Sequence, residues 1–72
     1  MGSKYPILSP KQIISALEKK GFVFVKQRGS HMKYQNEQYT VIIPNHSEVA
    51  KGTLKSILSM ANIELEEFLK LL

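Results

Sequence analysis

Apolar residues in the first third of the chain recur at the spacing of a helix, between signals that start and stop one. Ser9 is suited to cap a helix, Pro10 fits the first helical position, and Gln12 follows Ser9 at capping-box spacing. The apolar positions then lie three or four residues apart: Ile13, Ile14 and Leu17. Gly21 is a typical residue after a helix end. The pattern therefore predicts a helix that begins after Ser9 and ends before Gly21.

Three short runs with the composition and period of β-strands follow. They cover residues 22–27, 31–35 and 39–43. The first is rich in β-branched and aromatic residues, which favour strands. In the second, Met32 and Tyr34 alternate with polar residues, as expected of a strand with one buried face and one solvent-exposed face. Short polar turns separate the runs, and Pro44 closes the third, so an antiparallel meander is predicted.

Two further apolar patterns of helical period follow the polar loop at residues 45–51. Their positions are Leu54, Ile57, Leu58 and Ala61, and then Leu65, Phe68, Leu69 and Leu72. We expect both stripes to be core, with any surplus on the last helix available to a partner protein. The predicted fold is α+β, in the order α-β-β-β-α with a short C-terminal helix. Its helices cover one face of a three-stranded antiparallel sheet and leave the other partly open.

The length of the chain bounds the number of domains, and its charge indicates a class of partner. A chain of 72 residues predicts one domain spanning residues 1–72, with residues 1–8 as a flexible or cloning-derived end. Ten Lys and Arg residues against six Glu give a net charge of +4. Residues 1–55 contain nine of the basic residues and three of the acidic ones. This surplus points to a polyanionic partner, most commonly nucleic acid, although a basic charge also serves solubility alone.

Composition excludes several classes of function. The chain has no cysteine, so disulfides, thiolate metal sites and a cysteine nucleophile are excluded, and a reducing cytoplasm is expected. No apolar run approaches the roughly 18 residues of a membrane span, and the first residues do not resemble a signal peptide. There is no Asp, and the two histidines stand fifteen residues apart, so we expect no metal and no cofactor.

His31 is the strongest candidate for chemistry. It opens the second strand, about 7 Å from Lys33 along the same face, and it follows Lys26, Arg28 and the turn at residues 29–30. Imidazole can take or give a proton near neutral pH, and the neighbouring cations attract phosphate. Such a base suits activation of a ribose 2′-hydroxyl for attack on the adjacent phosphorus. The alternative is a histidine that is simply solvated on an edge strand.

Other polar and aromatic residues have both a functional and a structural interpretation. Three of them surround the predicted start of the second helix: Lys51, Thr53 and Lys55. Free backbone N–H groups there favour a phosphate, whereas the alternative is a solvated first turn with Thr53 as its cap. His46 either donates a proton to a leaving oxygen or fixes its loop, and we favour the structural role. Tyr34 and Tyr39 either stack on bases or fill core positions.

Three stretches of the sequence stand out together: Gly21 to His31, Val41 to His46 and Lys51 to Leu58. In this order and spacing they resemble the HicA family of bacterial toxins that act as mRNA interferases. The resemblance, over roughly residues 9–69, implies a fold like that of double-stranded-RNA-binding domains. It also implies cleavage of mRNA through the histidine of the Gly-Ser-His motif, here His31, and silencing by a HicB antitoxin that covers this site.

The sequence therefore predicts a cytoplasmic, metal-independent endoribonuclease toxin, with His31 as general base, that inhibits translation until a HicB-type antitoxin neutralises it. We expect it to be a monomer alone and a hetero-oligomer with the antitoxin. The residues expected to hold RNA are Lys26, Arg28, Ser30, Lys33, Lys51, Thr53 and Lys55. Two alternatives remain: a non-catalytic RNA-binding module of the same fold, and a protein-interaction domain whose basic charge is incidental.

Overall fold

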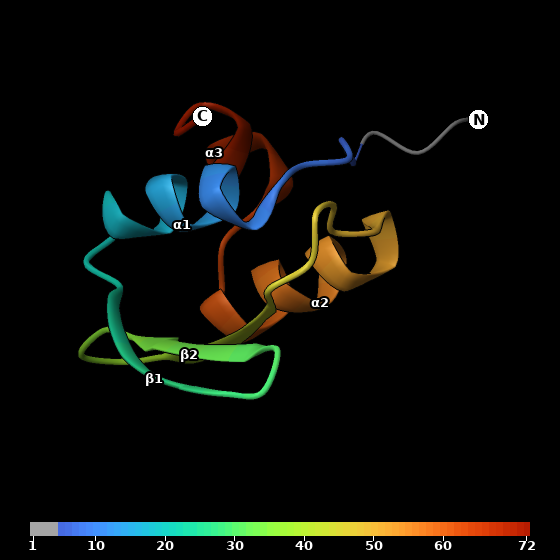
Figure 1. Ribbon diagram of the computed structural model, residues 1–72. Helices are drawn as coiled ribbons and strands as arrows, with labels where there is room; N and C mark the ends of the chain where they lie inside the picture. The colour runs from blue at the N-terminus through green and yellow to red at the C-terminus, as the bar shows by residue number, and fades with distance from the viewer. Residues whose placement is uncertain (1–4) are drawn as a thin grey trace.

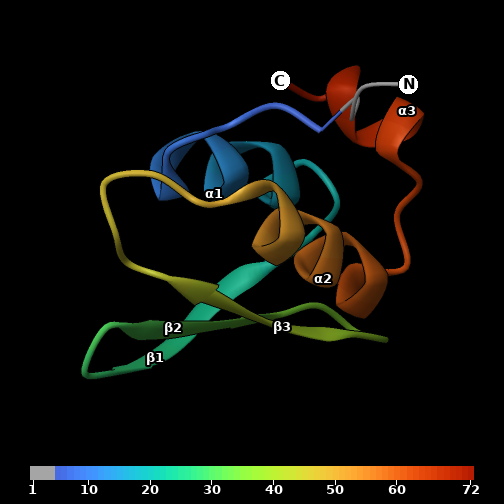
Figure 2. The same cartoon turned by 90° about the vertical axis from the view of Figure 1, so that its right-hand side faces the viewer.

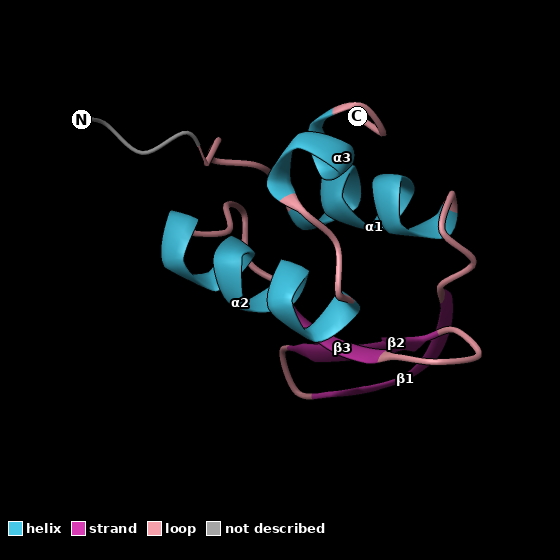
Figure 3. Cartoon of the chain, turned by 180° about the vertical axis from the view of Figure 1, so that it is seen from behind, coloured by secondary structure: helices cyan, strands magenta, loops and turns pink. Residues whose placement is uncertain are grey.

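In residues 5–72, which the computed structural model describes, three helices lie on one side of a three-stranded antiparallel sheet (Figure 1). The elements are α1 (Pro10–Glu18), β1 (Val23–Arg28), β2 (His31–Gln35), β3 (Thr40–Pro44), α2 (Lys51–Ala61) and α3 (Leu65–Leu69). The predicted α+β order is confirmed, and each strand starts and ends within one residue of its predicted position. The view from behind shows the same two layers (Figure 3).

Local hydrogen bonds start and stop α1 where the sequence predicts. The Gln12 backbone N–H donates to Ser9 Oγ at 3.3 Å, and Gln12 Oε1 accepts from the Ser9 backbone N–H at 3.0 Å. At the other end Gly21 has φ +85°, and the Phe22 N–H donates to the Leu17 carbonyl at 3.2 Å. This left-handed glycine and the bond that spans it form a Schellman end, which turns the chain toward β1.

The strands follow the order β1-β2-β3, so β2 lies in the middle of the sheet. The alternative interpretation of His31 placed it on an edge strand, and that placement is wrong. Met32 and Tyr34 of β2 are buried toward the helices, as the alternation predicts. The pairing of β1 with β2 contains a β-bulge between Phe24 and Lys26. Bulges bend a strand and increase its twist, and β1 crosses beneath β2 at a marked angle in Figure 2.

The core lies between the sheet and the helices. Its members come from every element except β1: among the largest are Ile13, Leu17, Ile43, Leu54, Ile57 and Phe68, together with Phe22, which precedes β1. Of the predicted C-terminal stripe, Phe68 is fully buried and Leu65 is half-buried, but Leu69 and Leu72 are exposed. The core prediction is thus confirmed for Phe68 and wrong for Leu69 and Leu72, which form the exposed surplus at this end of the chain; Leu72 lies beyond α3, which ends at Leu69.

The segment before α1 is also part of the structure. The Val49 N–H donates to the Leu8 carbonyl at 2.7 Å, and both side chains are buried. Leu8, which the sequence analysis assigned to a flexible end, therefore belongs to the core. Residues 1–4 of that predicted end lie outside the described part of the chain. Across the described residues, none of the helices has the length and apolar character that a membrane crossing requires.

A basic candidate site on the open face of the sheet

The register of the sheet gathers the predicted strand cations around His31. Arg28 and Pro44 flank His31, and Lys26 and Ile42 flank Lys33. Directly paired residues of an antiparallel sheet point to the same face, here the face opposite the buried Met32. We call Lys26, Arg28, His31 and Lys33 the basic face.

The basic face encloses a shallow depression of about 100 Å³. Its lining consists of Lys26, Arg28, His31, Lys33 and Ile42. His31 is exposed, as predicted, and Ile42 contributes apolar surface beside it. Long basic side chains can lay their apolar stems along such a surface and keep their charged ends in water. The depression is therefore open to solvent and is bordered by basic side chains.

No carboxylate lines this depression, and its positive charges lie directly opposite each other. Lys26 pairs with Lys33 across the strands, where Cβ atoms are about 5 Å apart and like charges destabilise a sheet. Within residues 5–72 the ion pair that does form joins Lys20 to Glu67 in the helical layer. The charge of the basic face is thus left for a group outside the chain to neutralise.

The turn that carries His31 is fixed by hydrogen bonds on both sides. Gly29 has φ +57°, a left-handed conformation that glycine adopts without strain. Gln27 Nε2 donates to the Gly29 carbonyl at 2.7 Å, and the Asn45 N–H donates to the Ser30 carbonyl at 2.6 Å. Ser30 itself is exposed beside His31. These bonds tie the turn to β1 and to the loop after β3, and so fix the backbone from which the imidazole projects.

A comparison with protein families identifies the chain. The family model that matches is described as HicA toxin of bacterial toxin–antitoxin, and the match covers residues 10–63, three quarters of the 72 residues. The chain belongs to the HicA toxin family. It is thus a toxin of a toxin–antitoxin system, which implies an antitoxin partner. None of the curated proteins matches the chain.

The matched segment of this HicA toxin runs from α1 through α2 and contains the whole basic face. The resemblance stated from the sequence is thereby confirmed at the level of the family. Helix α3 lies beyond the matched residues.

The three residues predicted at the start of α2 do not join the basic face. They belong to α2, which lies in the helical layer (Figure 2), whereas His31 lies on the face of the sheet opposite the buried Met32. Helix α2 begins after Ala50 without a side-chain cap, and Thr53 is half-buried inside its first turn. The interpretation of Thr53 as the cap is therefore wrong. Lys51 and Lys55 are exposed, so any contact they make with RNA is separate from the depression.

His46 is exposed in the loop after β3 and does not line the depression. Within the described residues its side chain makes no hydrogen bond, so the loop-fixing role gains no support from the structure.

Tyr34 is buried, and its ring lies edge-to-face with that of Phe24, with 5.6 Å between the ring centroids. Burial, together with the negative charge of Glu18, raises the pKa of the Tyr34 hydroxyl. The Tyr39 hydroxyl accepts from Asn62 Nδ2 at 2.9 Å. Both tyrosines thus have structural roles.

Two features of the site were missed from the sequence. Ile42 lines the depression, and its exposure was implied by the alternation of β3, because its neighbours Val41 and Ile43 are buried. The second feature is the like-charge pairing of Lys26 with Lys33, which the bulge after Phe24 sets. No local sequence signal specifies that register.

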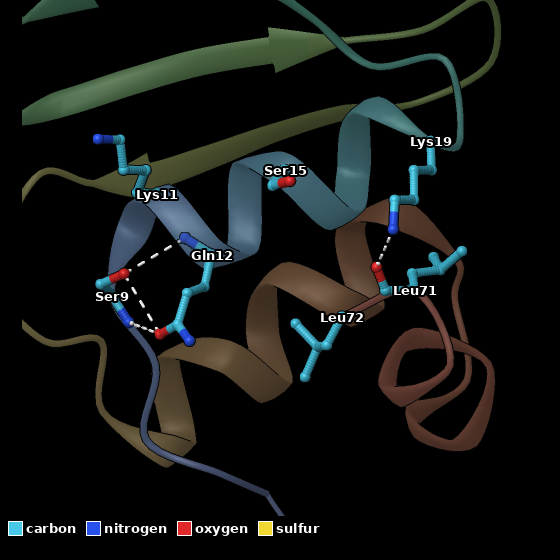
Figure 4. A pocket seen from close by; sticks show the side chains of 7 residues that line it. All are labelled: Ser9, Lys11, Gln12, Ser15, Lys19, Leu71 and Leu72. Carbon is cyan, nitrogen blue, oxygen red and sulfur yellow. Dashed lines mark hydrogen bonds between the residues drawn. The ribbon is translucent and has the colours of Figure 1, made fainter.

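A larger cavity, of about 300 Å³, lies between α1 and the C-terminal residues (Figure 4). It is lined by Ser9, Lys11, Gln12, Ser15, Lys19, Leu71 and Leu72. Several of its polar groups already bond each other, including Lys19 Nζ to the Leu71 carbonyl at 2.7 Å. Neither a histidine nor a carboxylate side chain lines it. Elsewhere in residues 5–72, no three potential metal ligands of the His, Cys, Asp or Glu type come together.

Proposed function

We propose that this HicA toxin is an endoribonuclease that cleaves mRNA with His31 as general base, without a metal ion, and thereby inhibits translation. The observation that supports the proposal is an exposed imidazole at the start of the central strand, beside cations that have no carboxylate partner. Such a face attracts the RNA backbone by its charge, and RNA carries the hydroxyl group that an imidazole can activate.

In the proposed reaction the backbone phosphate lies over the depression, next to Lys26, Arg28 and Lys33. His31 accepts the proton of the 2′-hydroxyl, and the 2′-oxygen forms a bond to the adjacent phosphorus. The bond from phosphorus to the 5′-oxygen breaks, which leaves a 2′,3′-cyclic phosphate, and water supplies the proton that the 5′-oxygen takes up. The three cations stabilise the negative charge that builds up on the phosphoryl oxygens. DNA, which has no 2′-hydroxyl, is not a substrate in this mechanism.

The remaining predicted residues extend the RNA contact in this proposal. Ser30 lies beside His31 in the turn, where its hydroxyl is available to a phosphate oxygen. Lys51, Thr53 and Lys55 form a second contact region at the uncapped start of α2, reached by a strand that passes around the sheet. A HicB-type antitoxin covers His31 in the cytoplasmic hetero-oligomer, and the free toxin is a monomer. His46 is left as a secondary candidate outside the depression.

The test compares wild-type protein with His31→Ala and His46→Ala on a single-stranded RNA of defined sequence in the presence of a chelator. His46 is the matched control, because it is the other histidine and is also exposed. We expect His31→Ala to lose at least about a hundredfold in cleavage rate, the usual contribution of a general base, and to keep its RNA affinity. His46→Ala should cleave the RNA at the wild-type rate. A substrate with a 2′-deoxy sugar at the cleavage position should not be cleaved by any of the proteins.

The alternatives give different results in the same experiment. Cleavage by His31→Ala at the wild-type rate would remove His31 from the mechanism. RNA binding that weakens with added salt, but with no cleavage by the wild-type protein, would identify a non-catalytic RNA-binding module. Absence of salt-dependent RNA binding would indicate a protein-interaction domain instead.

A further inference from the structure

Strand β1 is an open edge with an apolar segment on it. All six of its residues are exposed, and three of them are large hydrophobic residues: Val23, Phe24 and Val25, at 60%, 53% and 40% exposure. The strand pairs with β2 on one side, and within the described sheet no strand covers its other side. An edge of this kind presents unpaired backbone N–H and C=O groups beside apolar side chains, which is a template for another strand.

The two halves of β1 differ in chemistry. The first half is apolar, and the second half brings Lys26 and Arg28, with Lys33 directly opposite on β2. A strand that fits this edge therefore needs apolar side chains along residues 23–25 and carboxylates near the two cations. No carboxylate of the chain occupies that position, since the depression that these cations line contains none.

A second copy of the chain fits the edge poorly. Each copy has a net charge of +4, and pairing two β1 strands would bring two basic faces together without supplying a carboxylate. The bulge next to Val25 and the edge lysine are also features that natural proteins use against indiscriminate edge pairing. Charge complementarity thus favours a different protein with an acidic strand.

We propose that β1 is the docking edge for an extended acidic strand of a partner protein, which adds to the sheet as a fourth strand through main-chain hydrogen bonds. Its apolar residues cover Val23, Phe24 and Val25, and its carboxylates approach Lys26 and Arg28. The antitoxin that family membership implies is the partner to test. Because Lys26 and Arg28 are also proposed to hold RNA, the strand competes with RNA, and this competition alone rests on the function proposed above.

The experiment measures binding of the purified cognate antitoxin to the double variant Val23→Gln/Val25→Gln. Glutamine removes apolar surface from the edge without adding charge, so it does not alter the electrostatic attraction of RNA. The matched control is Ile7→Gln/Met60→Gln, whose residues are exposed to the same degree, 55% and 38%, but lie outside the sheet. We expect antitoxin affinity to fall about tenfold or more in the β1 variant and less than about twofold in the control.

Hydrogen exchange on the wild-type complex tests the backbone pairing directly and does not depend on how a variant folds. Backbone amides in residues 23–28 that exchange fast in the free toxin are expected to slow when the antitoxin binds. Unchanged exchange, or equal antitoxin affinity of the β1 variant, would overturn the proposal. A wild-type dimer that the β1 variant breaks would assign the edge to a second copy, and a selective loss of RNA affinity would assign it to RNA.

These outcomes separate the docking edge from the nuclease. If the wild-type protein does not cleave RNA but the β1 variant loses the antitoxin, the cleavage mechanism fails and the docking edge stands. If cleavage depends on His31 and the β1 variant still binds the antitoxin, the nuclease stands and the docking edge fails. The cleavage rate of the β1 variant is expected to equal that of the wild-type protein, because Val23 and Val25 do not line the depression.

Discussion

Replacing Lys26 by glutamate is expected to make the free toxin more stable and a weaker RNA binder. In the wild-type sheet Lys26 lies directly opposite Lys33, so two positive charges share one cross-strand position. Opposite charges at such a position contribute about 0.2–1 kcal/mol, and like charges destabilise by a similar amount. Lys26→Glu removes the repulsion and adds an attraction, for a net gain of about 1 kcal/mol in the free energy of unfolding. In a domain of this size that raises Tm by about 4–8 °C.

The same substitution should lower RNA affinity, because it removes a cation from the basic face and places a carboxylate there. Loss of one phosphate contact reduces the slope of log affinity against log salt by about 0.7 for a single strand. The assays are thermal unfolding at low salt and at about 1 M salt, where screening is nearly complete, and RNA binding by fluorescence anisotropy. We expect the gain in Tm to shrink at high salt.

Lys70→Glu is the control for net charge, since it makes the same change after α3, beside Glu66 and Glu67. It should not raise Tm, and it should change RNA affinity much less than Lys26→Glu does. A lower Tm for Lys26→Glu than for the wild-type protein at low salt would refute the inferred repulsion between Lys26 and Lys33. Equal RNA affinity of the Lys26 and Lys70 variants would refute the assignment of the basic face to RNA.

Two further substitutions test the scaffold. Phe68→Ala removes the one fully buried side chain of α3 and should lower the free energy of unfolding by about 3–5 kcal/mol in urea denaturation; a loss below about 1 kcal/mol would show that α3 is not anchored by this ring. Gly29→Ala should cost about 1 kcal/mol through its φ of +57° alone, because no atom beyond the adjacent residues lies within 4 Å of the added Cβ. Gly29→Asn should recover part of this loss in thermal unfolding, and equal Tm for all three proteins would contradict a left-handed turn.

Much of the fold was predictable because its signals are local. The capping box of Ser9 with Gln12 and the glycine at position 21 depend on residues within one turn of each other, so they act in the same way in the sequence and in the structure. The alternation of Met32 and Tyr34 likewise identified the buried face of β2. That face then determined that His31 points to the open side, which is the part of the candidate site that could be predicted.

The rest depends on pairings that sequence periodicity does not encode. The bulge between Phe24 and Lys26 sets which residue faces Lys33, and the strand order places β2 in the middle of the sheet. Periodicity also shows that a helix has an apolar stripe but not whether another element is there to cover it. Leu69 shares its stripe with the buried Phe68 and is nevertheless exposed. For the same reason the sequence could place Lys51 near a helix start but not on the opposite side of the sheet from His31.

Strand β1 contains two features that each weaken an isolated domain: an exposed apolar segment, and a lysine directly opposite another lysine. Both could be removed by substitutions in β1 without touching the core, because none of its six residues is buried. Because both features lie on one strand, a single ligand can cover the apolar segment and neutralise the lysines together. An anionic ligand relieves the repulsion between Lys26 and Lys33, but a nucleic acid leaves the apolar edge at residues 23–25 in water. A protein strand with apolar and acidic residues satisfies both halves at once, so the edge fits an inhibitor better than it fits a substrate.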